Sequence, residues 1–414
     1  MNKLPNGWEE KRLDDLFKEF TEKNHADKNI LASTQDRGVI PSDLLDRHII
    51  RKKESLSNYK LVKKGCFVIS LRSFQGGFEY SNYEGIISPA YTILEPKMKL
   101  VDDFYKYYFK SYYFINKSLP KYAEGIRDGK QIKYKACKEI LVPYPPLDEQ
   151  KLIASALSKI DAYLENTIKL IEEKERFKRG IAKKLLTCKE GENIPEARFK
   201  GFEDEWEIVK LGDIGTITAT GVDKKINDNE TPIKLLNYLD VFNRNKLYEK
   251  EISYMTTATE KQLEKCNIRK GDLFITPSSE DKKGIAKSSV AMEDFKNTVY
   301  SYHIIRVRFN KEIDLKFKSY MCDTDFFHRQ AYRLCDGSGQ RYFIKLDNFR
   351  NMEICIPKSI KEQEKIGGYL SLLDEEIDNL KKQKELIKEM KRGAMQKLLS
   401  GEVRLSKNAF NENI

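Results

Sequence analysis

The sequence lacks the patterns that mark a disulfide framework, a metal centre or a membrane span. Its seven cysteines are odd in number and form no C-x-x-C pair, which excludes a recognisable zinc site and favours free thiols in a reducing compartment. The four histidines show no metal-ligand spacing. No run approaches the ~18 apolar residues that span a bilayer, and the first residues lack a secretion signal's apolar core. We expect a cytoplasmic protein that binds no metal.

Signatures of catalysis are missing as well. There is no G-x-x-x-x-G-K-[ST] loop for ATP, no G-x-G-x-x-G after a strand, and no N/D-P-P-Y/F run for amino methylation of adenine. Glu149-Gln150-Lys151 resembles a fragment of some nuclease signatures, but such triplets arise by chance when 34% of the residues are charged. His303 is expected to lie in a strand. We therefore predict a polypeptide with no catalytic residue and no bound cofactor.

What the chain does contain is an internal duplication of about two hundred residues. Trp8-Glu9 near the start is echoed by Trp206-Glu207. From Glu149 to Leu186 and from Glu362 to Leu399 the two copies align without a gap, and 15 of these 38 positions are identical. That identity exceeds what a shared helical composition would give, so an internal repeat organises the chain.

Each copy has a globular part followed by a long amphipathic part. The first part is rich in Tyr, Phe, Ile and Val, and it predicts strands near 66–71, 86–94 and 139–143 with helix near 102–116. In the second part, apolar residues recur in steps of three and four, which is typical of a coiled coil about 40 residues or ~60 Å long. The predicted seam is Ile153, Leu157, Ile160, Leu164, Ile168, Ile171, Ile181 and Leu185 in the first copy, and Ile366, Leu370, Leu373, Ile377, Leu380, Ile387, Ala394 and Leu398 in the second.

The predicted fold class is therefore α+β, with two pseudo-symmetric globular domains and two long helices. We expect the helices to pair with each other, the alternative being that each packs along its own globular domain. Lysines 174, 178, 384 and 391 on the seam would fray the pair or admit a partner. The predicted parts are domain 1 (1–145), helix 1 (146–187), a linker with domain 2 (188–357), helix 2 (358–402) and a tail (403–414). We expect the chain to be loose from residue 400 onward, so the last three residues assigned to helix 2 are included in this loose segment.

The positive charge points to nucleic acid. Lys and Arg outnumber Asp and Glu by 75 to 64, a net charge of +11, and the excess is clustered among aromatic residues. Loops at matched places in the two copies differ in sequence, as expected for one scaffold with two recognition surfaces; the alternative is ordinary turns with solvated charges. The candidate DNA-binding residues are Arg51, Lys52, Lys53, Arg72, Ser73, Gln75, Arg127, Lys130 and Gln131 in the first copy, and Ser278, Ser279, Lys282, Lys283, Arg333, Ser338, Gln340, Arg341 and Tyr342 in the second.

These features together resemble the specificity (S) subunit of Type I restriction–modification enzymes, over essentially the whole length. The resemblance rests on four motifs: Pro5-Asn6-Gly7-Trp8-Glu9, Arg198-Phe199-x-Gly201-Phe202 before Trp206-Glu207, Pro145-Pro146-Leu147-x-Glu149-Gln150, and the Lys-Arg-Gly…Lys-Leu-Leu helix ends. The second copy departs at the start of its helix, where Lys358-Ser359-Ile360-Lys361 replaces Pro145-Pro146-Leu147-Asp148.

The resemblance implies two target-recognition domains held apart by antiparallel helices, each domain recognising half of a bipartite double-stranded DNA target. Two modification (M) subunits would dock on the helices and methylate adenine with S-adenosylmethionine. Restriction (R) subunits would cleave DNA using ATP and Mg. Two other functions stay open at this point: an enzyme with an unfamiliar site, and a coiled-coil scaffold that binds only proteins.

Overall fold

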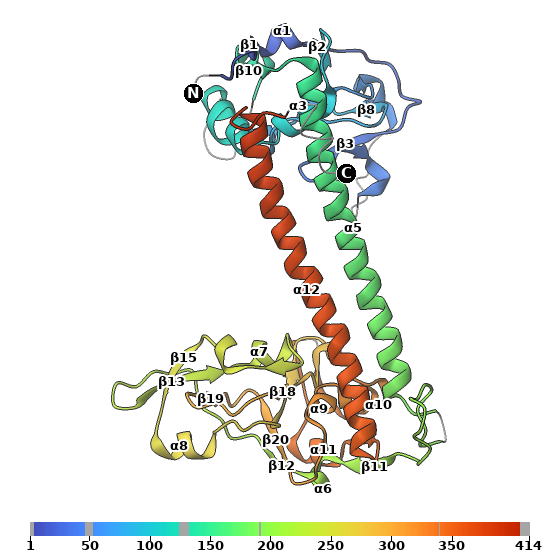
Figure 1. The fold of residues 1–414 in the computed structure, drawn as a ribbon, viewed down its shortest axis with the longest axis vertical. Helices are drawn as coiled ribbons and strands as arrows, with labels where there is room; N and C mark the ends of the chain where they lie inside the picture. The colour runs from blue at the N-terminus through green and yellow to red at the C-terminus, as the bar shows by residue number, and fades with distance from the viewer. Residues whose placement is uncertain (1–3, 46–52, 124–131, 190–191, 339, 406–414) are drawn as a thin grey trace. The chain divides into compact units, whose positions relative to one another are not determined.

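The computed structural model describes residues 4–45, 53–123, 132–189, 192–338 and 340–405, apart from the side chains of 53–55, 74 and 283. The chain folds into two compact units. Unit 1 comprises residues 1–169 and 382–414, and unit 2 comprises residues 170–381. Each unit therefore contains a globular part together with segments of two long helices, which are labelled α5 and α12 in Figure 1.

The long helices are α5 (Leu147–Leu186) and α12 (Ile360–Leu399), each of 40 residues. They begin at equivalent residues of the two copies. In α5 the amides of Glu149 and Gln150 donate to the Pro146 carbonyl at 2.9 and 3.0 Å, and in α12 the equivalent amides donate to the Ser359 carbonyl at 3.1 Å each. The serine thus starts the second helix in the same register as the proline starts the first.

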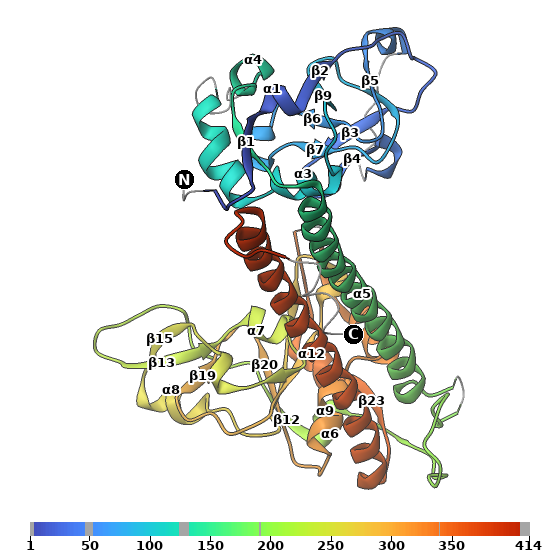
Figure 2. The same ribbon diagram turned by 45° about the horizontal axis from the view of Figure 1, so that its top comes forward.

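The globular part of unit 1 is built on a four-stranded sheet in the order β2-β9-β6-β7, whose strands are labelled in Figure 2. Three two-stranded pairs (β1-β10, β3-β4 and β5-β8) surround it. The strands are β1 (Glu9–Arg12), β2 (Phe17–Phe20), β3 (Leu31–Thr34), β4 (Gly38–Pro41), β5 (Lys60–Val62), β6 (Phe67–Ile69), β7 (Glu79–Tyr80), β8 (Gly85–Ile87), β9 (Thr92–Pro96) and β10 (Leu141–Tyr144).

Apart from its segments of α5 and α12, unit 1 has only short helices. Its core is aromatic. Phe17 packs edge-on against Phe67 and Tyr105 with ring centroids 5.4 and 5.6 Å apart. The predicted single strand 86–94 is wrong: Pro89 lies in a turn, because proline has no amide for the ladder, and this turn separates β8 from β9. The helices are α1 (Leu13–Leu16), α2 (Ser73–Gly76), α3 (Asp102–Tyr108), α4 (Tyr134–Cys137), 3₁₀ turns at Ser42–Leu44, Lys53–Asn58 and Leu119–Tyr122, and a π turn at Phe114–Ser118.

Unit 2 has a five-stranded sheet in the order β12-β20-β16-β18-β14, whose central strand β16 is buried at all three positions. Further sheets are β15-β13-β19, β17-β22-β21 and β11-β23. The strands are β11 (Glu207–Lys210), β12 (Gly215–Thr218), β13 (Thr231–Leu236), β14 (Lys246–Leu247), β15 (Met255–Ala258), β16 (Leu273–Ile275), β17 (Ser278–Ser279), β18 (Ser288–Ala291), β19 (Thr298–Tyr300), β20 (Ile305–Phe309), β21 (Asp336–Ser338), β22 (Arg341–Phe343) and β23 (Glu353–Ile356).

The shorter helices of unit 2 cover its sheets and lead into the candidate site. The longest of them, α10, follows α9 after a short turn, and its N-cap Thr324 accepts from the amide of Phe327. These helices are α6 (Leu211–Ile214), α7 (Tyr238–Phe242), α8 (Glu260–Lys265), α9 (Leu315–Met321), α10 (Asp325–Leu334) and α11 (Leu346–Asn351), with 3₁₀ turns at Glu249–Glu251 and Lys282–Gly284.

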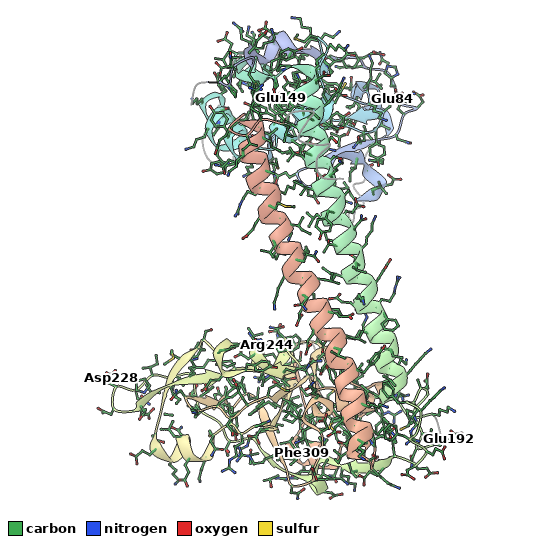
Figure 3. The ribbon with its side chains drawn as sticks, in the orientation of Figure 1. Glu84, Glu149, Glu192, Asp228, Arg244 and Phe309 are labelled. Carbon is green, nitrogen blue, oxygen red and sulfur yellow. The ribbon has the colours of Figure 1, made fainter. Side chains whose placement is uncertain are left out.

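The start of each long helix is fixed by a buried carboxylate bonded to a tryptophan and an arginine. In unit 1, Glu149 (Figure 3) accepts from Trp8 Nε1 at 2.9 Å and from Arg404 Nη2 at 2.7 Å. In unit 2, Glu362 accepts from Trp206 Nε1 at 3.3 Å and from Arg198 Nε at 2.7 Å. The same cluster is thus built twice from distant segments of the chain.

The next residue of each helix is a glutamine that is equally buried. Gln150 accepts from the Val101 amide and donates to the Pro145 carbonyl, while Gln363 accepts from the Asp314 amide and donates to the Pro357 carbonyl, all at 2.8–2.9 Å. Both side chains are at most 1% exposed. Because both ends of each amide are bonded, hydrogen bonds offset the cost of burying these glutamines, which fix the helix against its globular part.

Within each unit the two helix segments contact each other through ion pairs. In unit 1, Asp161 on α5 accepts from Tyr107 at 2.8 Å and pairs with Lys391 of α12 at 2.6 Å. The equivalent Asp374 in unit 2 bonds Tyr320 and Lys178. Lys174 also pairs with Glu376 at 2.6 Å. Lys174, Lys178 and Lys391 therefore join the helices instead of fraying them. Among the ion pairs of the described residues, the fourth seam lysine, Lys384, pairs only with its neighbour Glu385.

The seam itself differs from the predicted one at its middle. Ile168 is 37% exposed and Thr167 is buried in its place, whereas Ile171 is buried as predicted. With Leu164 half-buried, the inward positions of α5 run 160, 164, 167 and 171, which is the alternating step of four and three of a heptad. The helices pair with each other, as expected, and the first turns of each helix also pack on its globular part. Each of the two packing predictions therefore holds in part. Ile153 and Leu157 lie in the unit 1 core, and Ile366, Leu370 and Leu373 lie in the unit 2 core.

The residues after α12 are fixed by contacts, at least as far as Leu405. Arg404 donates to Glu149 and, at 2.9 Å, to the Asn6 carbonyl. Gly401 has φ +73° and lies so close to Pro5 that an added Cβ would come within 2.2 Å of the proline ring. The loose tail predicted from residue 400 onward is therefore wrong for 400–405, and 406–414 lie outside the described residues.

In the part of the chain that the structure describes, no helix is both long and apolar enough to cross a membrane.

We expect the two carboxylate clusters to differ in their contribution to stability. Arg198→Met should lower the unfolding free energy of unit 2 by about 3 kcal/mol, because it leaves Glu362 buried without a cation. Arg404→Met should cost unit 1 only about 1 kcal/mol, since the Arg404 side chain is 42% exposed against 13% for Arg198. Urea unfolding followed by Trp206 fluorescence in a Trp8→Phe background, and by Trp8 in a Trp206→Phe background, measures each unit. A larger loss for Arg404→Met would contradict the assignment.

Candidate nucleic-acid interface

Two candidate loops of the second copy form one small sheet in unit 2. β17 pairs with β22, placing Ser279 opposite Tyr342, and β22 pairs with β21, placing Ser338 opposite Arg341. We call β17, β22 and β21 the readout sheet. The sheet joins loops that are some sixty residues apart in sequence, so the candidates from these two loops share one surface.

The side chains of the readout sheet are oriented by contacts among themselves. Arg341 is exposed and donates through Nη2 to the hydroxyl of Ser278 at 3.0 Å. Lys282 Nζ lies 5.2 Å from the Tyr342 ring centroid. Ser278 is 8% exposed, so its hydroxyl positions Arg341, while Ser338 and Gln340 are exposed. The sheet therefore presents a guanidinium, an amide and a hydroxyl to solvent, which are the groups that hydrogen-bond base edges.

The remaining candidate residues of unit 2 differ in their exposure to solvent. Ser279 is half-buried and its hydroxyl accepts from the Asp281 amide. Arg333 is exposed near the end of α10, just before β21 begins. The side chain of Lys283 lies outside the described residues.

A turn and a loop that sequence reasoning missed lie beside the readout sheet. His303 lies in the turn between β19 and β20, so its predicted strand position is wrong. Burial, and then the charges of Arg341 and Lys224, lower the pKa of His303. Exposed aromatic residues accompany the cations: Tyr302 is 47% exposed, and Lys224 Nζ lies 5.4 Å from the ring centroid of the 42% exposed Tyr254.

Tight backbone packing holds this turn and loop together. The Val222 amide donates to the Tyr300 carbonyl at 2.9 Å, and the Tyr302 amide donates to the Val222 carbonyl at 3.3 Å. The chain passes so close that a Cβ on Gly221 would lie 2.3 Å from the Ser301 carbonyl carbon. The sequence signal that was available is the Gly221-Val222-Asp223-Lys224-Lys225 run, a glycine turn followed by two lysines.

The loop of unit 1 that contains Arg72, Ser73 and Gln75 corresponds to the β17 loop of unit 2 but has a different structure. It contains the single-turn helix α2, in which Ser73 is 2% exposed and accepts from the Ser70 amide at 2.8 Å, so Ser73 closes the turn. Arg72 and Gln75 are exposed. Lys110 donates to the Gly76 carbonyl at 2.8 Å beneath the loop. Arg51, Lys52, Arg127, Lys130 and Gln131, and the side chain of Lys53, lie outside the described residues.

The predicted partner-binding residues of the helices are mostly buried inside the units. Ile153, Leu157, Ile366, Leu370, Leu373 and Ile377 are at most 7% exposed, and Ile160 and Leu164 are half-buried. Other large apolar side chains on the helices face solvent instead. They are Tyr163 and Ile168 on α5 and Leu386 and Met390 on α12 in unit 1, and Leu170 and Phe177 on α5 and Leu372 on α12 in unit 2.

The described side chains do not suggest metal chemistry. Over the described residues, no cluster of three or more His, Cys, Asp or Glu side chains is arranged to hold a metal ion. The groups that gather at the readout sheet are instead cations, amides, hydroxyls and aromatic rings, which suit hydrogen bonding and electrostatic binding.

A sequence profile decides the family. The profile described as Type I restriction modification DNA specificity domain matches residues 5–173 and again residues 203–389. The chain belongs to this family. The two matches correspond to the two copies of the duplication, so the specificity domain occurs twice in this specificity subunit.

Known members of the family resemble the chain over nearly its whole length. It is 26% identical over 415 residues to the Type I restriction enzyme MjaVIII specificity subunit of Methanocaldococcus jannaschii, covering 99% of this chain and 96% of that protein. It is 23% identical over 373 residues to the MjaIX specificity subunit of the same organism, covering 87% and 82% of the two chains.

Solved structures share the fold. A chain from a study of complex assembly and conformational transition in a type I R-M system matches with a TM-score of 0.61 and 14% identity, covering 97% of this chain and all of that one. The HsdS subunit from Thermoanaerobacter tengcongensis matches with a TM-score of 0.53 and 16% identity, covering 97% of this chain and 98% of the other. These likenesses confirm the predicted fold class of a specificity subunit.

The readout sheet leads to a prediction about DNA recognition. Arg341→Ala should weaken binding of the assembled complex to its target duplex by about 5- to 150-fold and relax selection in one half of the target, because a guanidinium–base contact contributes about 1–3 kcal/mol. Arg350→Ala is the matched control: it removes an equal charge from α11, where Arg350 pairs with Asp347. Fluorescence anisotropy at fixed salt measures the affinity of both variants for the target duplex. Equal losses for the two variants would show that Arg341 contributes charge alone.

Proposed function

We propose that this chain recognises a two-part target in double-stranded DNA, one globular domain for each half, and is not itself catalytic. The observation that carries the proposal is the readout sheet, which gathers exposed Arg341, Gln340 and Ser338 at one place in unit 2. Membership of the specificity family supports it. In this account Lys and Arg neutralise phosphates, and the sheet's amide, hydroxyl and guanidinium groups select bases.

The same proposal assigns bond making and breaking to other polypeptides. Two modification subunits would bind the long helices and methylate adenine with S-adenosylmethionine, and restriction subunits would supply ATP- and Mg-dependent cleavage. The exposed apolar residues of α5 and α12 support a protein partner on these helices. Phe177 and Met390 occupy equivalent positions of the two copies and are 53% and 49% exposed, which suits two copies of one partner.

The helices would also set the spacing of the two half-targets. α5 and α12 are each uninterrupted for 40 residues, so their length is a fixed property of the chain. We propose half-sites about one helical turn apart, ~34 Å centre to centre. Inserting one turn into both helices should widen the unspecified gap between the half-sites. An unchanged gap in the methylated sequences of that variant would rule out this role of the helices.

The helix surface is tested by placing a charge on it. Phe177→Glu and Met390→Glu should each reduce binding of the modification subunit at least tenfold, because a carboxylate would be buried against an apolar partner surface. Leu44→Glu is the control, since Leu44 is 52% exposed and lies in the 3₁₀ turn Ser42–Leu44 instead of on a long helix. Size-exclusion chromatography with light scattering gives the stoichiometry, and the double variant should bind no modification subunit. Full assembly of the double variant would contradict the docking proposal.

Independence of the two domains is tested by exchange. Residues 1–145 would be replaced by the first domain of another specificity subunit that keeps the equivalents of Trp8 and Tyr107, so that the contacts to Glu149 and Asp161 are preserved. Methylation mapping should then show a new sequence in one half of the target and the original sequence in the other. New sequences in both halves would refute independent recognition.

A further inference from the structure

Two cysteines in unit 2 lie face to face although they are far apart in sequence. The Sγ atoms of Cys188 and Cys355 are 2.8 Å apart, and both thiols are free. Cys188 follows the end of α5 and bridges Pro195, while Cys355 lies in β23 opposite Ile208. A disulfide needs sulfur atoms about 2.05 Å apart, so a movement of less than ~1 Å would close the bond.

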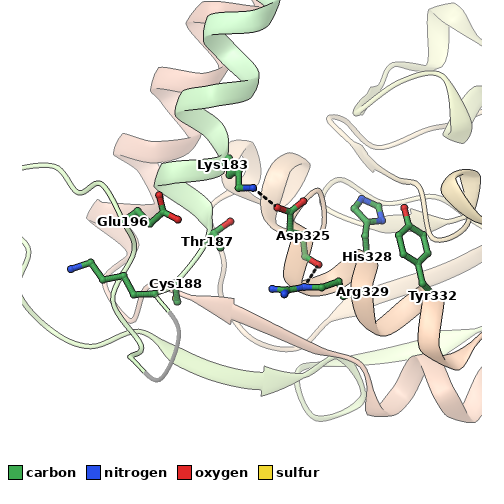
Figure 4. A pocket seen from close by; sticks show the side chains of 9 residues that line it. Lys183, Thr187, Cys188, Glu196, Asp325, His328, Arg329 and Tyr332 are labelled. Carbon is green, nitrogen blue, oxygen red and sulfur yellow. Dashed lines mark hydrogen bonds and ion pairs between the residues drawn. The ribbon is translucent and has the colours of Figure 1, made fainter.

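A cavity gives access to one member of this pair. It has a volume of about 510 Å³ and is lined by Cys188 together with side chains from α5, the following segment and α10 (Figure 4). Three cations, Lys183, Lys189 and Arg329, line it against the carboxylates of Glu196 and Asp325, and Lys183 pairs with Asp325 at 2.8 Å. The cavity is therefore large enough for a small organic molecule and carries a slight excess of positive charge.

Cys188 differs chemically from the other cysteines. The hydrogen bond shared with Cys355 lowers the pKa of Cys188; burial opposes this effect, and the charge of Arg198 adds to it. Burial raises the pKa of Cys66 to about 11 and the pKa of Cys137 and Cys322 to about 12. Because the thiolate is the nucleophile in disulfide exchange, reactivity should concentrate at Cys188, with Cys355 in place to resolve the product.

We propose that Cys188 and Cys355 form a dithiol modification site that a low-molecular-weight disulfide oxidises to an intramolecular disulfide. The Cys188 thiolate attacks one sulfur of the small disulfide, forming a mixed disulfide and releasing one small thiolate. The Cys355 thiol then loses its proton, attacks Cys188 Sγ and releases the second small thiol. Two protein thiols are oxidised and one small disulfide is reduced to two thiols.

The bond would cross-link the exit of α5 to the strand that leads into α12. Cys188 is two residues beyond the last residue of α5, and Cys355 is five residues before the first residue of α12. A cross-link between positions so far apart in sequence restricts the unfolded chain, so the oxidised protein should unfold at a higher temperature than the reduced protein.

The test uses the full chain with oxidised glutathione as the probe. Wild-type protein should lose two of its seven thiols, and non-reducing peptide mass spectrometry should find one linked pair, Cys188 with Cys355, together with a rise in the unfolding temperature that dithiothreitol reverses. Glutathione attached to half-buried Cys335 in place of this pair, or a linkage between other cysteines, would overturn the proposal.

Three variants, each checked for folding by circular dichroism, separate the two steps. Cys355→Ser should stop at the mixed disulfide, with one glutathione on Cys188. Cys188→Ser should form neither product, and Cys335→Ser should behave as wild type. Glutathione absent from Cys188 in the folded Cys355→Ser protein would refute the assignment of Cys188 as the attacking thiol.

Discussion

A buried carboxylate at the start of each long helix, Glu149 in unit 1 and Glu362 in unit 2, joins that helix to two distant segments of the chain. A buried carboxylate is tolerated only when its charge is paired and its oxygens are bonded. Each carboxylate meets this condition with an indole N–H from the start of its globular domain and a guanidinium from the segment that follows the other long helix. Neither unit can therefore be completed from one copy of the duplication alone.

This constraint explains why the two copies resemble each other more closely in their long helices than in their candidate recognition loops. The helix residues at equivalent positions make the same contacts twice: Gln150 and Gln363 bond backbone groups, and Asp161 and Asp374 bond a tyrosine and a lysine. Changing one of them would leave a buried polar group without a partner. Among the described residues, the candidate recognition loops show no such hydrogen bonds to the helices. This fits the different structures of α2 in unit 1 and of the readout sheet in unit 2 on a shared framework.

Sequence reasoning predicted the features that repeat or are periodic. The duplication, both long helices, most of the seam and the positions of the candidate loops follow from matched residues and from apolar spacing. It missed what depends on pairing between distant segments: the readout sheet joins β17 to β21 and β22, and Arg404 reaches Glu149 from the far end of the chain. Thr167 took the seam position expected for Ile168 because helix geometry, not hydrophobicity alone, decides which residue points inward.

The most direct test of two-part recognition is the pattern of methylated adenines in a genome that carries this chain and its modification subunit. The account predicts one motif with two specified halves separated by a fixed run of unspecified bases, and a methylated adenine in each half. A single continuous motif, or two halves at variable separation, would contradict it.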